Sequence, residues 1–266
     1  MTTARGPQRV DGWTAAVRQR LGLGRLLPLG GPADGAWIAE TAAASVLRGA
    51  AARPGTVLGK LRIGPATEAT ADGEVPGASS EPGAPPAPPS ALPPGPLRIE
   101  AEFSAAPDRP LPAAAAALRA ALLTAAAARL GLEIAEVDLT VTALLEDGAA
   151  DQVTAPAPVA ARPGVEPEGP VAAAAAGTPG VVSLTRVLGS PVHTTGEHVR
   201  VEVATAGDHR ALDVARSVRT AVAAATEGTL PVSVLVTDVV GPDAVGPDVV
   251  RPDVVGTDVV RPGSGG

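Results

Sequence analysis

The chain has 266 residues, including 31 glycines and 29 prolines, and a formal net charge of −7. Cysteine is absent, which excludes disulfides, Cys-ligated zinc, iron–sulfur clusters and thiol nucleophiles. The one lysine, Lys60, is the only residue that could form a Schiff base. The acidic balance argues against sequence-independent binding to nucleic acid. The apolar stretch 21–29 is interrupted by Arg25 and Pro28, so it predicts neither a secretory signal nor a membrane span.

Residues 1–35 predict a short amphipathic helix followed by a turn-rich segment. Asp11 is placed to cap a helix over 11–23, in which apolar residues recur at every fourth position. A helix of this length is not stable in isolation, so we expect it to dock on another surface. We favour docking on the first domain and leave open docking on a membrane surface or a protein partner. The candidate interaction residues are Trp13, Val17, Arg18, Arg20, Leu21 and Arg25.

Residues 36–147 predict a first domain. Its clearest strand is 97–103, LRIEAEF, in which apolar and charged residues alternate as they do when one face is buried. Its clearest helix is the alanine-rich segment 111–130, which ends at Gly131. The Pro-rich insertion 65–96 has too few apolar residues to order itself, so we expect it to be disordered. The remaining expected elements are a turn-rich passage over 26–35, a helix over 37–52, a strand over 56–63 and a strand over 134–145.

A second Pro- and Gly-rich linker, 148–170, which we also expect to be disordered, precedes a segment that repeats the order of the first domain. Five short matches occur in the same order in both segments, which predicts an internal duplication with a second domain at 171–240. Among the matched pairs are LRIEAEF at 97–103 with VRVEVAT at 199–205, LRAAL at 118–122 with VRTAV at 218–222, and VDLTVTALL at 137–145 with VSVLVTDVV at 232–240.

The C-terminal end is a pentapeptide array, in which an aspartate recurs every five residues from Asp238 to Asp258. A period of five fits neither a helix nor a strand, and the recurring prolines remove backbone donors. We therefore expect residues 241–266 to be disordered.

Glycine motifs of nucleotide-binding proteins are incomplete in this chain. Gly22 and Gly24 lack the third glycine of a dinucleotide-binding fingerprint. Gly59 and Lys60 lack the earlier glycine of a phosphate-binding loop and the Ser or Thr that follows its lysine. The sequence therefore gives no cofactor-binding residues.

The histidines also lack the pattern of a site. His193 and His198 flank a predicted turn, and we interpret them as loop residues rather than metal ligands. His209 follows Asp208 at the start of a predicted helix, where Asp208 is placed to act as the cap, as is Asp108 in the first copy. We assign no catalytic and no metal-binding residues.

The order of a helix, a Pro-Gly turn, a strand, LRIEAEF, an Ala-rich helix and the closing strand GLEIAEVDLTVTALL resembles the alkaline shock protein family, a group of bacterial envelope stress-response proteins. The resemblance covers about 36–145 and, more weakly, 171–240. The leading segment DGWTAAVRQRLGLGRLLPLGG, joined to DGAWIAE, is similar to actinobacterial proteins that are labelled as the nucleopolyhedrovirus P-ten family. The resemblance to the alkaline shock protein family implies small αββαβ domains in a non-enzymatic protein that acts through protein partners in cell-envelope homeostasis.

These observations predict an α+β protein with two tandem αββαβ domains, each a small three-stranded sheet packed with helices. We expect a cytoplasmic protein-interaction or scaffold module at the inner face of the membrane, which binds a protein partner or itself and uses no cofactor or small-molecule substrate. One alternative is a nucleic-acid-binding module that uses the N-terminal arginines and the strand arginines Arg98 and Arg200. Another is a hydrolase that uses His209.

Overall fold

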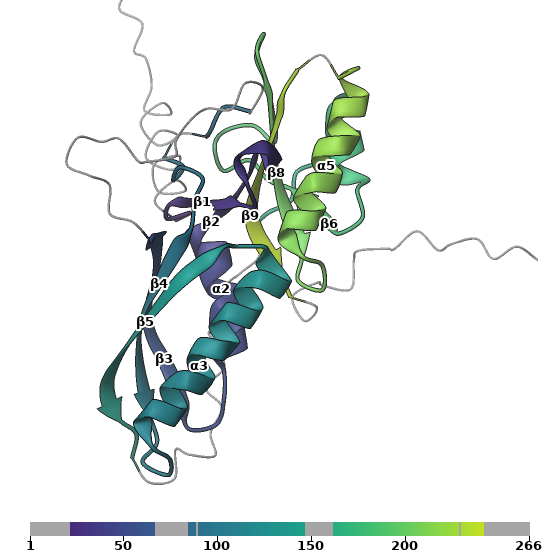
Figure 1. Ribbon diagram of the computed structural model, residues 1–266. Coiled ribbons are helices and arrows are strands. Elements are labelled where there is room, and N and C mark those ends of the chain that lie inside the picture. The colour runs from purple at the N-terminus through teal and green to yellow at the C-terminus, as the bar shows by residue number, and fades with distance from the viewer. Residues whose placement is uncertain (1–21, 67–84, 89, 147–161, 229, 242–266) are drawn as a thin grey trace, which may run out of the picture.

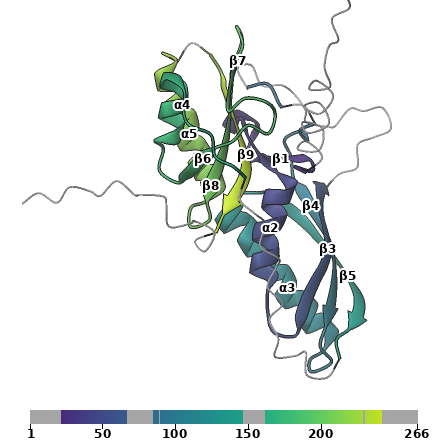
Figure 2. The same cartoon turned by 180° about the vertical axis from the view of Figure 1, so that it is seen from behind.

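A computed structural model describes residues 22–66, 85–88, 90–146, 162–228 and 230–241 (Figure 1). The fold is α+β, as predicted, with a six-stranded and a three-stranded sheet. Helix α3 lies on the three-stranded sheet and α5 on the six-stranded sheet. Helix α2 lies between the two sheets in both views (Figures 1 and 2). Residues 11–21 of the predicted helix over 11–23 and the pentapeptide array beyond residue 241 lie outside the described residues, and Gly22 and Leu23 form a turn rather than the end of a helix.

The described residues form short helices and strands. In chain order they are β1 (Leu26–Leu29), η1 (Pro32–Asp34), β2 (Ala36–Ala39), α2 (Glu40–Ala51), β3 (Thr56–Pro65), β4 (Leu97–Ala105), α3 (Leu111–Ala125), η2 (Ala126–Leu130), β5 (Ile134–Leu144), α4 (Gly169–Ala176), β6 (Val181–Leu184), β7 (Val192–Thr194), β8 (Val199–Ala206), α5 (Ala211–Ala225) and β9 (Val232–Val240).

The three-stranded sheet has the order β3-β4-β5. Strand β4 is antiparallel to β3 and parallel to β5, and α3 makes the crossover between the two parallel strands. Ile99 and Phe103 on β4 are completely buried, whereas Glu100 between them is exposed. The alternation that predicted a strand over 97–103 is therefore confirmed, because one face of β4 meets the core and the other meets solvent.

Helix α3 continues through one π-helical segment, η2, and stops at Gly131, where the sequence predicts its end. Gly131 has a φ of +91°, and a Cβ at this position would lie 2.5 Å from the Cβ of Leu212 at the start of α5. A glycine is therefore needed both for the left-handed backbone and for the close approach of the two helix ends. The end of the first copy thus packs directly on the second.

The second sheet has six strands rather than the three that we expected. Its order is β1-β2-β9-β8-β6, and β7 pairs with the same edge of β8 as β6 does. Strand β2 adds to the edge of β9 in parallel, with Trp37 opposite Leu235 and Ile38 opposite Val236. The N-terminal segment of the first copy is thereby part of the sheet of the second.

The expected helix over 37–52 begins three residues late, and the expected turn passage over 26–35 contains a strand. Residues Leu26–Leu29 and Ala36–Ala39 form a hairpin of two fully buried strands around the short η1 turn. A short apolar run that is buried on both faces shows no alternation of polar and apolar residues. Its sequence therefore cannot be told from that of a buried helix end. Tertiary pairing with β9 decides for a strand, and α2 starts at Glu40.

Both copies use the same pairing pattern, as the predicted duplication implies. In the second copy β6 is antiparallel to β8, and β8 is parallel to β9 through α5. The matched segments 97–103 and 199–205 lie in the equivalent strands β4 and β8. The short strand β7 has no counterpart among the described residues of the first copy.

Parts of the two Pro-rich segments pack against the six-stranded sheet. In the insertion, Ala91 forms a parallel bridge with Leu26, and the amide of Leu92 donates to the carbonyl of Leu26. In the second linker, Val165 forms an antiparallel bridge with Leu184. The expectation of disorder is therefore wrong for these residues, because carbonyls at the two sheet edges accept hydrogen bonds from the amides of Leu92 and Val165. Residues 67–84, 89 and 147–161 lie outside the described residues.

The shared sheet generates the first prediction. Ile38 is completely buried on β2 beside β9, so Ile38→Ala should lower the free energy of unfolding by about 2–5 kcal/mol. Urea unfolding followed by circular dichroism measures this loss, and amide exchange of β9 should accelerate because its edge partner is weakened. The control is Glu197→Ala at an exposed position on the β7–β8 turn, with an expected change within about 0.5 kcal/mol. An Ile38→Ala protein as stable as the control would contradict the role of β2.

Candidate interaction surface

Of the six candidate interaction residues, the described part of the chain contains only Arg25. Its Nη2 donates to the carbonyl of Ile63 at 2.6 Å, and its guanidinium forms an ion pair with Glu40 at 3.4 Å. Glu40 Oε1 also accepts the amide of Ile63 at 3.0 Å. Arg25 therefore joins the N-terminal hairpin to the outer edge of β3. Trp13, Val17, Arg18, Arg20 and Leu21 lie outside the described residues.

Burial alone would raise the pKa of Glu40. The hydrogen bonds from the Arg25 side chain and from the amides of Ile63 and Arg25 outweigh that effect and hold the pKa below its ordinary value. The carboxylate is thus ionised near neutral pH, and its charge is balanced within the cluster.

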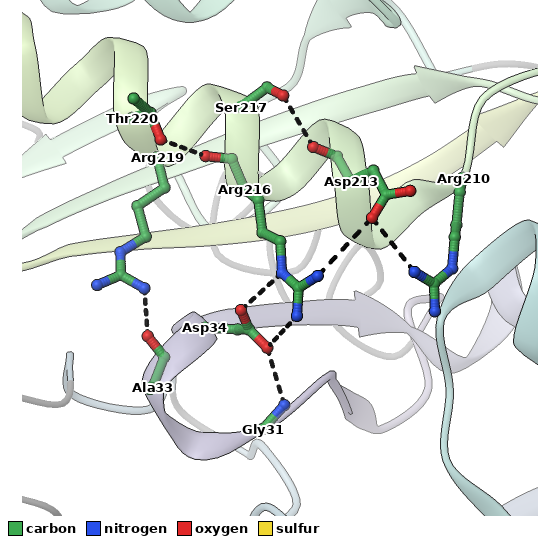
Figure 3. A network of polar contacts seen from close by, with 9 residues as sticks. All are labelled: Gly31, Ala33, Asp34, Arg210, Asp213, Arg216, Ser217, Arg219 and Thr220. Carbon is green, nitrogen blue, oxygen red and sulfur yellow. Dashed lines mark hydrogen bonds and ion pairs between the residues drawn. The ribbon is translucent and has the colours of Figure 1, made fainter.

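A second polar cluster fastens the η1 turn to α5 (Figure 3). Arg216 contacts Asp34 through two hydrogen bonds of 2.8 and 3.0 Å, and Asp34 also accepts the amide of Gly31 at 2.9 Å. Arg219 donates to the carbonyl of Ala33 in the same turn. The hydrogen bond from Arg216 holds the pKa of Asp34 below its ordinary value, against the opposing effect of burial. This cluster is an internal fastening between the copies rather than a free charged surface.

The strand arginines both have carboxylate partners. Arg98 lies within 3.8 Å of Glu136 and 3.6 Å of Asp138 on the neighbouring strand β5. Arg200 lies 3.5 Å from Glu202, and its side chain is only 11% exposed. A phosphate group would have to displace these carboxylates to bind either arginine.

Glu202 is a completely buried acid in the middle of β8. Its carboxylate accepts the amide of Val187 at 2.6 Å and the amide of Leu188, so it holds the loop before β7 against the sheet. Desolvation raises its pKa despite these hydrogen bonds and the nearby Arg200. Among the described residues, this carboxylate contacts the backbone of the loop before β7 and Arg200 on its own strand, so it fastens the loop to the sheet.

His209, the residue of the hydrolase alternative, is exposed beside an exposed Asp208. His209 Nδ1 lies 2.8 Å from Asp208, and the amide of His209 bonds back to Ala206. The expectation that Asp208 caps the helix is wrong, because the N-cap of α5 is Arg210, which makes no side-chain cap bond. The same holds for the start of α3, whose N-cap is Pro110.

Of the other two histidines, both predicted to lie in loops, His193 lies in strand β7 and His198 lies in the turn before β8. The rings of His193 and His198 are edge to face, with centroids 6.4 Å apart, and His198 bonds to Thr195 at 3.0 Å. Within the described ranges no group of three or more His, Cys, Asp or Glu side chains could hold a metal ion.

Two shallow grooves occupy equivalent places in the copies. One, of about 400 Å³, lies between the end of α2 and α3, and the other, of about 480 Å³, lies between α4 and α5. Arg53 and Thr178, at matched Pro-Gly turns, line the two grooves, as do Ala117 and Ser217 on the matched helices. Both are lined largely by alanine and other small side chains, which supply few directional contacts for a small molecule.

The most distinctive exposed feature lies on the first copy. Across the described residues, all of the exposed large apolar side chains lie on α3 and β5, and we call them the apolar edge. The helical segment Leu111–Leu130 is also long and apolar enough to cross a membrane by length and composition, and a third of it is buried. Its inner side packs on the core through Leu118 and Leu122. The apolar edge consists of Leu111, Leu123, Val141 and Leu144.

None of these residues is among the six candidate interaction residues that the sequence suggests. The strand over 134–145 is predicted correctly, and its inward positions are apolar. The sequence does not reveal that α3 leaves the far end of β5 uncovered, because the helix position depends on packing with α2. The available signal was the length of β5, because its apolar inward positions extend over more residues than α3 can cover.

The Arg25–Glu40 cluster generates a prediction about pH. Glu40 has a lowered pKa in the folded state, so its stabilising contribution is complete above its ordinary pKa of 4.5 and is lost as pH falls below that value. Glu40→Gln should therefore cost about 1.5–3 kcal/mol at pH 7 and much less at low pH, because the lost hydrogen bonds are charge-assisted. Urea unfolding at several pH values measures this. An equal cost at pH 3 and pH 7 would show that the cluster acts through packing alone.

Models of known protein families, characterised proteins and solved structures were each compared with this chain, and none of the three comparisons gave a match. The resemblance to the alkaline shock protein family therefore stays a prediction from the sequence.

Proposed function

We propose that this chain is a non-enzymatic protein-interaction module that uses the apolar edge of α3 and β5 to bind a protein partner or itself. The main support for this proposal is that the exposed large apolar side chains of the described residues lie on these two adjacent elements. Single exposed apolar residues are common on any protein, but a cluster next to a strand with an unpaired edge is typical of an association surface. In line with the sequence resemblance, we place this activity in cell-envelope homeostasis, in the cytoplasm at the inner face of the membrane.

The position of the two largest contributors supports this proposal. Val141 is opposite Phe103, and Leu144 is opposite Ala105, so both belong to the inner face of the sheet that carries the core. Phe103 and Ala105 are completely buried under α3, whereas Val141 is 39% and Leu144 60% exposed. The core of the first copy therefore continues to the edge of the sheet and ends there without a covering element among the described residues.

The nucleic-acid alternative has less support from the described residues. Arg98 is surrounded by Glu100, Glu136 and Asp138, and the Arg200 side chain is largely buried. A surface that binds a phosphate backbone needs accessible, uncompensated cations.

A photo-crosslinking residue at position 144 in the full chain, expressed in its native host, should give covalent adducts of higher mass. The same residue at Glu197, which is exposed on the β7–β8 turn, serves as the control and should give none. When the crosslinking residue is at position 144, Val141→Asp should reduce adduct formation, because a charge opposes apolar burial. When it is at position 141, Leu144→Asp should do the same.

The matched control substitution is Ala173→Asp, which adds the same charge at an exposed position on α4. The Leu144→Asp and Val141→Asp variants should melt close to the parent protein, since neither Leu144 nor Val141 is buried. Equal adduct yields at 144 and 197 would contradict a specific interaction surface on the first copy.

A further inference from the structure

The two copies differ in how the edge after their closing strand is used. In the second copy β2 pairs with the edge of β9. In the first copy β5, the equivalent strand, pairs with β4 on one side and with no other strand among the described residues. An edge strand of 11 residues with no proline and no lysine lacks two of the devices that commonly protect an exposed sheet edge.

The opposite edge of the same sheet is capped by side chains. On β3, Arg25 and Glu40 bond the carbonyl and amide of Ile63, and Arg48 donates to the carbonyl of Gly59. On β5, the described residues supply one such cap, the hydrogen bond of 3.3 Å from Arg119 Nε to the carbonyl of Val137. The β5 edge is therefore the available one.

The hydrogen bond from Arg119 also gives the direction of the backbone groups. The carbonyl of Val137 faces away from β4, and alternation along a strand puts the backbone groups of Leu139 and Val141 at the same free edge. The register with β4 shifts between Ile134 and Glu136 and again after Val141, so the regular stretch lies between these two irregularities. Its centre is close to Leu139.

This stretch is complementary to itself in antiparallel orientation. With Leu139 opposite its own copy, Val137 lies opposite Val141 on the inner face. On the outer face the two acids Glu136 and Asp138 lie opposite Thr142 and Thr140. Both acids also lie within 3.8 Å of Arg98 in their own subunit.

Shifting the centre by one residue toward the N-terminus places Asp138 opposite itself, and repulsion between the like charges opposes that register. Pairing about Leu139 instead gives each acid a neutral threonine as its neighbour. It also keeps the apolar inner faces of both sheets, and hence both α3 helices, on one side.

We propose that a second copy of this chain occupies the β5 edge, forming a twofold-symmetric dimer with antiparallel β5 strands centred on Leu139. The two three-stranded sheets become one six-stranded sheet, and Val141 and Leu123 of each subunit are covered by the partner's apolar edge. Arg119 releases the carbonyl of Val137, which then accepts the amide of the partner's Val141. This inference rests on the proposed function, because it assigns the partner of the same surface.

The absence of cysteine makes the register testable in the full chain. Asp138→Cys and Thr140→Cys change exposed positions on the outer face, which face each other across the proposed interface. After mild oxidation, a mixture of the two single variants should contain at least about five-fold more disulfide-linked dimer than either variant alone, because diagonal positions are too far apart to bond efficiently. The unmodified chain should sediment at twice its mass of 26.1 kDa, and Val141→Asp should shift it toward the monomer.

Each other outcome overturns the dimer in a distinguishable way. Crosslinking of Thr140→Cys alone as efficient as the mixture places the centre on residue 140 and contradicts the register. A monomer at all tested concentrations, together with adducts to a different protein at position 144, overturns self-association and leaves the proposed function intact. A monomer without any adduct at position 144 overturns both. Ala173→Asp again controls for added charge and should leave the sedimentation unchanged.

Discussion

The parallel pairing of β2 with β9 is the contact on which the rest of the fold depends. β2 continues directly into α2, so the strand that completes the sheet of the second copy also fixes the first helix of the first copy. Trp37 and Ile38 lie on opposite faces of β2, and both are almost completely buried. Removing this strand from the sheet would therefore expose large apolar side chains on two faces at once, which is far more costly than breaking a surface contact.

Polar contacts near this pairing orient the copies rather than supply most of the stability. Asp34 reaches Arg216 on α5, and Glu40 reaches Arg25 and the edge of β3, so each end of β2 has its own charged fastening. The close approach of Gly131 to Leu212 adds a steric constraint at the other junction. Exposed ion pairs alone are worth little, but here they select one arrangement of surfaces that burial already brings together.

The same pairing explains why duplicated units need not share a function. In the second copy the edge of β9 is consumed inside the chain, so it contributes to the common core. In the first copy the matched edge of β5 is left with apolar residues such as Val141 and Leu144 beside it. We infer that duplication has given one edge an internal role and left the other for association, and this asymmetry is the basis of the function that we propose. The dimer is the simplest use of such an edge, because a strand that is complementary to itself needs no other partner.

The sequence by itself determined the elements whose residues alternate or end with a clear signal. The alternation of Ile99, Glu100 and Phe103 predicts β4, Gly131 predicts the end of the α3 helix, and the repeated order of segments predicts two copies with one pairing pattern. Tertiary structure alone decided that Trp37 lies in a strand, that the second sheet has six strands and that the β5 edge is uncovered. The physical reason is that local periodicity records which face of an element is apolar, whereas the identity of the neighbouring element depends on contacts between residues about 200 positions apart, such as those of β2 with β9.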